Sequence, residues 1–241
     1  MTDEQIAKQL LKQYKKDDAG ILLTPDVAAQ FSALFREAVV DFFPKFVEKH
    51  KGQTIYGVSF EIGNLVQFVY EEDFETYLYF NTEEEYRKQI KDCAEDEKSY
   101  YRFEPYAEWD VVSADTKAFK KLQKFLMQNS LYYCTVYYNY DDLLSKEAVD
   151  WFEENSEVFE ENFDQERAMF RYLMAGVLCN LRQEGFWKEH GFEKLFVIPF
   201  EAEDELPFEE KIATYLQMDF GCHSGETDYL EYIKSLSADG D

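Results

Sequence analysis

The chain is poor in the residues that build covalent and metal-bound frameworks. Its 241 residues include only 4 cysteines, 3 histidines and 5 prolines. The cysteines, at positions 93, 134, 179 and 222, are too widely spaced for a zinc knuckle or a CxxC redox pair. No acidic run has the alternating oxygen ligands and sharp glycine turn of a calcium loop. We therefore expect reduced thiols, no disulfide framework and no dedicated metal site.

The chain also lacks the short motifs of the common enzyme and nucleotide-binding classes. It contains no GxGxxG, no GxxxxGKS/T, no HExxH and no GxSxG, and its 10 glycines leave little material for phosphate-binding loops. Cys222 and His223 are adjacent, but neighbouring side chains usually point apart and a nucleophile needs its base within hydrogen-bond reach. The pattern favours a structural role for this pair, and we expect no cofactor.

Long hydrophobic runs are missing as well. Uncharged stretches such as 172–181 are far too short to span a bilayer. The first residues, MTDEQIAKQLLKQYKK, predict a charged amphipathic helix without a hydrophobic signal region. These features predict a cytoplasmic protein that does not enter a membrane.

Acidic residues are plentiful. There are 50 Asp and Glu against 25 Lys and Arg, for a formal net charge of −25. The two signs balance in residues 1–52, so the whole excess lies in residues 53–241. Such a surface repels nucleic acid and anionic membranes and speeds encounters with basic proteins. We expect no nucleic-acid partner; the charge serves either solubility alone or the capture of a basic protein.

Apolar and aromatic residues supply ample material for a core. They make up 46% of the chain and include 22 Phe and 18 Tyr. The length fits one large α+β domain, which buries enough surface to need no disulfide or metal staple. We predict a single domain over residues 1–241, with 1–20 as an N-terminal helical extension and a core from about 24 to 236.

Helix and strand signals alternate along this domain. Thr24-Pro25-Asp26 predicts a helix start, and Pro44 is expected to kink or end that helix. Residues 54–62 and 65–70 predict two strands joined by a two-residue turn at Gly63-Asn64. Asn81-Thr82 predicts the cap of a further helix. Further helices are expected from Asp115 and over 146–183, 208–217 and 227–236, and strands over 131–140 and 192–201. The helix from Asp115 has an apolar face made of Ala118, Phe119, Leu122, Phe125 and Leu126. Together they predict a mainly antiparallel sheet covered by helices.

The stretch YYRFEPYAEWD, residues 100–110, carries the enzyme hypothesis. Its period-two pattern predicts a half-buried strand, broken or at an edge at Pro105, with Trp109 and Val111 among the inward residues. Arg102, Glu104, Tyr106, Glu108 and Asp110 would face outward. Two carboxylates two residues apart on a strand are separated by roughly 7 Å, which suits acid–base chemistry. Glu108 and Asp110 are therefore the weak catalytic candidates, with Arg102 or Tyr106 as stabiliser.

The binding hypothesis rests on a stripe of acidic residues along one predicted helix. Glu153, Glu157, Glu160, Glu161 and Asp164 fall on one helical face, with no Lys or Arg between positions 153 and 166. Like charges at this spacing cost an isolated helix about 0.2–0.5 kcal/mol per pair. Strong packing by neighbouring aromatics or a basic partner would offset that cost. The alternative is that this stripe, like the acidic run at 201–210, is simply a solvated surface.

Several of these segments resemble a known family. The order YGVSFEI, NTEEEY, YYRFEPYAEWD and LFVIPFEAEDE resembles an uncharacterised family of bacterial domains of unknown function, over roughly residues 25–220. The matching positions are Asn81, Thr82, Glu108 and Trp109. The family implies no activity. Similar small acidic domains occur among immunity proteins, which neutralise bacterial toxins, and this association implies an inhibitor.

The sequence therefore favours a non-enzymatic cytosolic protein-binding domain of the immunity type. In this hypothesis the acidic stripe meets a basic partner such as a toxin, and Arg102, Tyr106 and Trp109 are further binding candidates. One alternative is a hydrolase-like enzyme that uses Glu108 and Asp110. Another is a structural module that closes a homodimer. The sequence predicts no oligomeric state.

Overall fold

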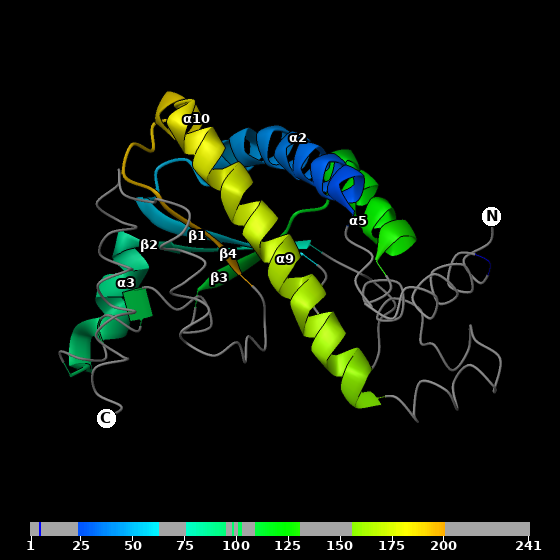
Figure 1. The fold of residues 1–241 in the computed structure, drawn as a ribbon. Coiled ribbons are helices and arrows are strands. Elements are labelled where there is room, and N and C mark those ends of the chain that lie inside the picture. Colours follow the sequence, from blue (N-terminus) through cyan, green and yellow to red (C-terminus); the bar gives the residue numbers. More distant parts are fainter. Residues whose placement is uncertain are drawn as a thin grey trace.

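A four-stranded mixed sheet packs against helices in the computed structural model (Figure 1). The structure describes Gln5 and residues 24–62, 76–94, 98, 101–102, 109–130 and 156–200; for 62, 156–165, 167–168, 198 and 200, only the backbone is described. The strand order is β3-β2-β1-β4. β1 pairs antiparallel with β2, β2 antiparallel with β3, and β1 parallel with β4. The predicted α+β class with a mainly antiparallel sheet is confirmed.

The first described helix, α2 (Pro25–Lys49), begins where the sequence predicts. Thr24 is its N-cap and accepts a hydrogen bond from the backbone N–H of Val27 at 3.3 Å. Pro44 does not end the helix, which continues to Lys49. Pro44 lacks only one N–H, and the aromatic residues on either side of it are buried in the core, so packing offsets the lost helical bond.

The predicted hairpin at Gly63-Asn64 is wrong. β1 (Ile55–Ile62) pairs along its length with β2 (Thr76–Thr82), in a register that places Ile62 opposite Thr76. The other edge of β1 holds β4 (Phe196–Phe200). Both edges of β1 are therefore occupied, by β2 and by β4.

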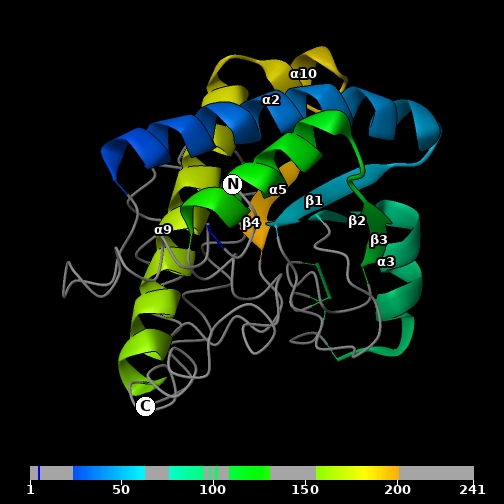
Figure 2. The ribbon, with the colours of Figure 1, turned by 90° about the vertical axis from the view of Figure 1, so that its right-hand side faces the viewer.

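The cap at Asn81-Thr82 is confirmed. The Thr82 hydroxyl accepts from the Glu85 N–H at 3.1 Å, while Asn81 Oδ1 accepts from the Thr82 N–H at 2.8 Å. α3 (Glu83–Gln89) then runs into a 3₁₀ turn, η1 (Ile90–Asp92). Figures 1 and 2 show α3 on the far side of the sheet from α2.

The strand predicted over residues 100–110 is only partly present. Tyr101 and Arg102 are helical, and β3 starts at Asp110 and ends at Ser113. Trp109 is buried as predicted, but Val111 is 49% exposed because β3 is a short edge strand. Residues 103–108, with Tyr106 and Glu108, lie outside the described part of the chain.

Three helices cover one face of the sheet (Figure 2). They are α2, α5 (Lys117–Asn129) and α9 (Ser156–Gln183); the short α10 (Phe186–Glu189) follows α9. The predicted apolar face of α5 is confirmed, and Lys120 and Lys121 pair with Asp115 and Glu37. One core joins these elements, with its largest buried side chains being Trp187, Phe31, Phe35, Phe43, Phe60, Phe119 and Phe170.

The expected helix over 4–16 is described only at Gln5, which is helical. The expected helices over 208–217 and 227–236 and the strand over 131–140 lie outside the described residues. Among the helices that are described, none combines the length and the hydropathy needed to cross a membrane.

Candidate functional site

Arg102 lies against two tyrosine rings on the α3 side of the sheet. Its guanidinium carbon is 4.4 Å from the ring centroid of Tyr56 and 5.0 Å from that of Tyr86. Its Nη2 is 3.1 Å from Glu83 Oε1, and the Arg102 side chain keeps 32% of its exposure. The face of an aromatic ring attracts a cation. The two tyrosine rings and the Glu83 carboxylate therefore hold the guanidinium of Arg102 in position.

Tyr56 connects this cation to the sheet. Its hydroxyl donates to the backbone carbonyl of Arg102 at 3.2 Å. Burial raises the pKa of Tyr56 above its usual value, and the neighbouring charge of Arg102 opposes that shift. Tyr56 is therefore a neutral hydrogen-bond donor at physiological pH, and its role here is to hold the segment that carries Arg102.

Trp109 supports the same segment from inside. Its side chain is 5% exposed, and its Nε1 donates to the carbonyl of Tyr101 at 3.2 Å. Its ring meets those of Tyr56 and Phe196 edge to face, at centroid separations of 5.8 and 6.4 Å. Trp109 thus packs in the interior, and the role that the structure shows for it is support rather than exposed contact.

The structure brings together only part of the predicted site residues. Arg102, the expected stabiliser, and Trp109, a binding candidate, both contact Tyr56, whereas the catalytic candidate Asp110 is exposed at the start of the edge strand β3. The charge of Asp110 acts on Lys88 of α3, whose pKa is raised first by its hydrogen bond with Glu85. Glu108 and Tyr106 are not described, so the hydrolase-like alternative stays a prediction. Within the described residues, no cluster of His, Cys, Asp and Glu is suited to hold a metal ion.

β1 carries a buried polar layer that the sequence pattern did not reveal. Ser59 and Glu61 are fully buried, and they alternate with Val58 and Phe60 of the main core. In the register they lie opposite Tyr79 and Tyr77 of β2. The alternation of apolar and polar residues in VSFEI is typical of a strand with one face toward solvent. The alternation is present in β1, but both faces of the strand are buried.

The acidic stripe lies on a helix, as predicted. Positions 157, 160, 161 and 164 belong to the N-terminal half of α9, while Glu153 lies outside the described residues. In Figures 1 and 2 this half of α9 extends past the sheet, away from α2. The C-terminal half packs in the core through Phe170, Met174, Leu178 and Leu181.

Comparisons of the chain with protein-family models, with curated proteins and with solved structures found no match. The resemblance to an uncharacterised bacterial family therefore stays a prediction. The roles of its described motif residues are structural: Asn81 and Thr82 cap α3, and Trp109 packs inside.

Proposed function

We propose that the chain is a non-enzymatic, cytosolic protein-binding domain that presents the acidic face of α9 to a basic partner protein. The acidic face is defined as Glu157, Glu160, Glu161 and Asp164, with Glu153 as its expected extension. The observation that supports the proposal most directly is that these acids lie in the N-terminal half of α9, which extends past the sheet.

Helix geometry separates this face from the core-facing side only in part. Each residue of an α-helix advances about 100° around the axis. The centre of the side set by the buried positions 170, 174, 177, 178 and 181 lies roughly 105° from the centre of the acidic face. Positions 157 and 160 are about five turns from the buried Ala175 and Leu178 and align with them. The support for the proposal is therefore the place of the acids along α9, not their angle around it.

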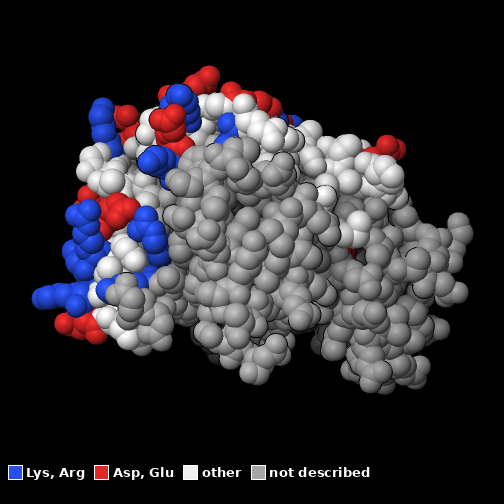
Figure 3. Space-filling view, turned by 60° about the vertical axis from the view of Figure 1, so that its left-hand side comes forward, with Lys and Arg blue, Asp and Glu red and all other residues white. Residues whose placement is uncertain are grey.

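Charge pairing is common over the rest of the described surface. Figure 3 shows Lys and Arg side chains interspersed with Asp and Glu over the described surface. Many of these acids have a basic partner within the chain, in the pairs Glu184–Arg36, Asp41–Lys45, Glu48–Lys51, Glu85–Lys88, Glu83–Arg102, Asp115–Lys120, Glu37–Lys121 and Glu193–Lys188. The acidic face has no Lys or Arg within its own stretch of sequence.

The helix dipole offsets only part of the repulsion between these acids. Glu157 lies in the first turn of α9 as described, where the positive end of the dipole favours negative charge, and the other acids lie beyond that turn. A basic partner would offset the repulsion that remains. In a complex, such charges mainly raise the association rate, while a few buried contacts hold the partner.

The finer form of the proposal is an inhibitor of the immunity type, bound to a basic bacterial toxin. Net charge and the family resemblance motivate it. Arg102, Tyr106 and the homodimer alternative are not needed for this form, and Trp109 contributes to it only through the packing of its segment.

The proposal is tested by capture from a lysate of the source organism with three forms of the tagged chain. The first is the wild type, and the second carries Glu157→Lys and Glu161→Lys. The third carries Asp92→Lys and Glu189→Lys, which change the net charge equally at two exposed sites outside the acidic face. Circular dichroism checks that all three fold alike.

We expect a basic protein that the wild type and the third form capture at moderate salt and that the second form loses. Because Lys in the first turns opposes the helix dipole, a neutral form with Glu157→Gln and Glu161→Gln is included. Equal capture by all forms, or loss in the second and third alike, would remove the acidic face from the account.

A further inference from the structure

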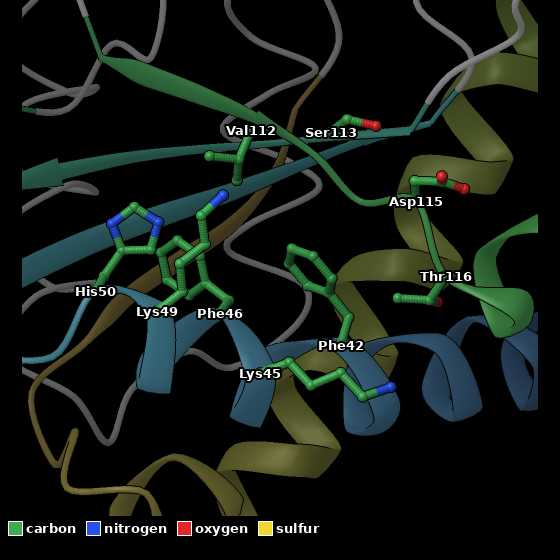
Figure 4. Close-up of a pocket in the computed structure, with 9 residues that line it drawn as sticks. All are labelled: Phe42, Lys45, Phe46, Lys49, His50, Val112, Ser113, Asp115 and Thr116. Carbon is green, nitrogen blue, oxygen red and sulfur yellow. The ribbon is translucent and has the colours of Figure 1, made fainter.

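A cavity of about 200 Å³ lies between the C-terminal end of α2 and the segment that joins β3 to α5 (Figure 4). Phe42, Phe46 and Val112 form its apolar wall. Its polar lining consists of Lys45, Lys49, His50, Ser113, Asp115 and Thr116. An apolar cavity of about 150 Å³ is enough to hold benzene. This cavity therefore has room for an aromatic ring, or a branched aliphatic chain, with one small substituent.

Lys49 supplies an uncompensated positive charge at this cavity. The lysines on either side of it in the sequence are paired, since Lys45 Nζ is 2.6 Å from Asp41 Oδ1 and Lys51 Nζ is 3.6 Å from Glu48 Oε1. Lys49 makes no ion pair with any residue in the described part of the chain. Figure 4 shows its side chain rising from α2 toward Val112, whereas Lys45 turns away.

His50 supplies a hydrogen-bonding atom at the same end. Its Nδ1 is 2.8 Å from Gln53 Oε1, an acceptor that places the hydrogen on Nδ1. Its ring is held against those of Phe46 and Phe80, at centroid separations of 4.7 and 4.6 Å. Its Nε2 is buried and has no hydrogen-bond partner among the described residues. A buried polar atom without a hydrogen bond destabilises the fold, and a ligand that forms a hydrogen bond with it removes that penalty.

We propose that this cavity binds a small monocarboxylate with an apolar body. The carboxylate pairs with Lys49 Nζ and lies beside Nε2 of His50, which donates to it when both ring nitrogens carry hydrogen. The apolar body packs on Phe42, Phe46 and Val112. Asp115 lies on the opposite side of the cavity in Figure 4 and disfavours a second negative group there. This site is separate from the acidic face of α9 and carries the opposite charge.

The test is a titration of the full chain with phenylacetate and with phenylacetamide, followed by NMR chemical-shift changes. The two probes have nearly the same shape and differ in charge. We expect saturable binding of phenylacetate at millimolar concentration, with the largest shifts at Lys49, His50 and Val112. Phenylacetamide should bind about tenfold more weakly, since a charge-assisted hydrogen bond contributes more than a neutral one.

Two variants separate a binding role from a structural one. Lys49→Gln should weaken phenylacetate about tenfold and leave phenylacetamide unchanged. Lys51→Gln removes an equal charge two residues away, at a side chain that is 78% exposed, and should change neither affinity by more than about twofold. Both sites are on the surface, so the fold should persist.

The proposal is overturned if phenylacetate does not bind, if acid and amide bind equally, or if Lys49→Gln and Lys51→Gln have the same effect. It is likewise overturned if the shifts map to a surface away from the end of α2.

Discussion

The indole of Trp109 occupies the space that a side chain at position 57 would need. A Cβ built on Gly57 would lie 2.6 Å from Cη2 of Trp109, closer than real Cβ atoms come to another heavy atom. Gly57 is in β1 and Trp109 immediately precedes β3, so this contact links two strands that are not neighbours in the sheet. It sets the position of the segment that carries Arg102.

Replacing Gly57 with alanine should therefore destabilise the fold. Because both the strand and the indole are buried, we expect a loss of about 1–3 kcal/mol in the free energy of unfolding, measured by urea denaturation. The smaller ring in Trp109→Phe should relieve the clash. Gly57→Ala should therefore lower the free energy of unfolding much less in the Trp109→Phe background than in the wild type. Additive effects would show that the two residues do not constrain each other.

Tyr56→Phe tests the hydrogen bond that holds Arg102. Loss of the hydroxyl that donates to the Arg102 carbonyl should cost about 1 kcal/mol at neutral pH. The folded-state pKa of Tyr56 is raised, whereas a tyrosine in the unfolded chain ionises near pH 10. Wild-type stability should therefore fall as pH rises above about 10, because only the unfolded chain then loses this proton. The stability of Tyr56→Phe should fall less steeply with pH. Identical slopes for the variant and the wild type would contradict the raised pKa of Tyr56.

Thr54→Val tests a pKa shift of the opposite sign. The Thr54 hydroxyl donates to Glu84 Oε1 at 2.6 Å, and this bond lowers the pKa of Glu84. The stabilisation is present above the ordinary carboxyl pKa of about 4.3 and is lost as pH falls through the folded-state value. In the variant, the carboxyl carbon of Glu84 should titrate at higher pH in an NMR experiment. A midpoint that does not move would assign the shift to other groups.

The elements defined by local signals were predictable. The Thr24-Pro25-Asp26 start of α2, the Asn81-Thr82 cap and the apolar stripe of α5 all rest on residues a few positions apart, and all are confirmed. Pro44 was misleading because tertiary packing keeps the helix intact around it. The hairpin was misleading because the partner of β1 is chosen by packing, not by the nearest turn.

The residues of the candidate sites were harder to predict because they come from distant segments. Arg102 meets Tyr56 across 46 positions, and no periodic pattern encodes that contact. Its aromatic surroundings were missed for the same reason. The cavity at Lys49 and His50 exists only because α2 ends beside β3. The helix of the acidic face was predictable, since its spacing is local; the extension of its N-terminal half past the sheet required the structure.

The measurement that tests the central claim most directly is the association rate of the captured basic partner as a function of salt. It compares the wild type with the form carrying Glu157→Lys and Glu161→Lys, and the form carrying Asp92→Lys and Glu189→Lys is the control. We predict that reversal on the acidic face slows association and flattens its dependence on salt, while the control keeps the wild-type slope. An unchanged rate and slope for the acidic-face form would contradict the claim that this face meets the partner.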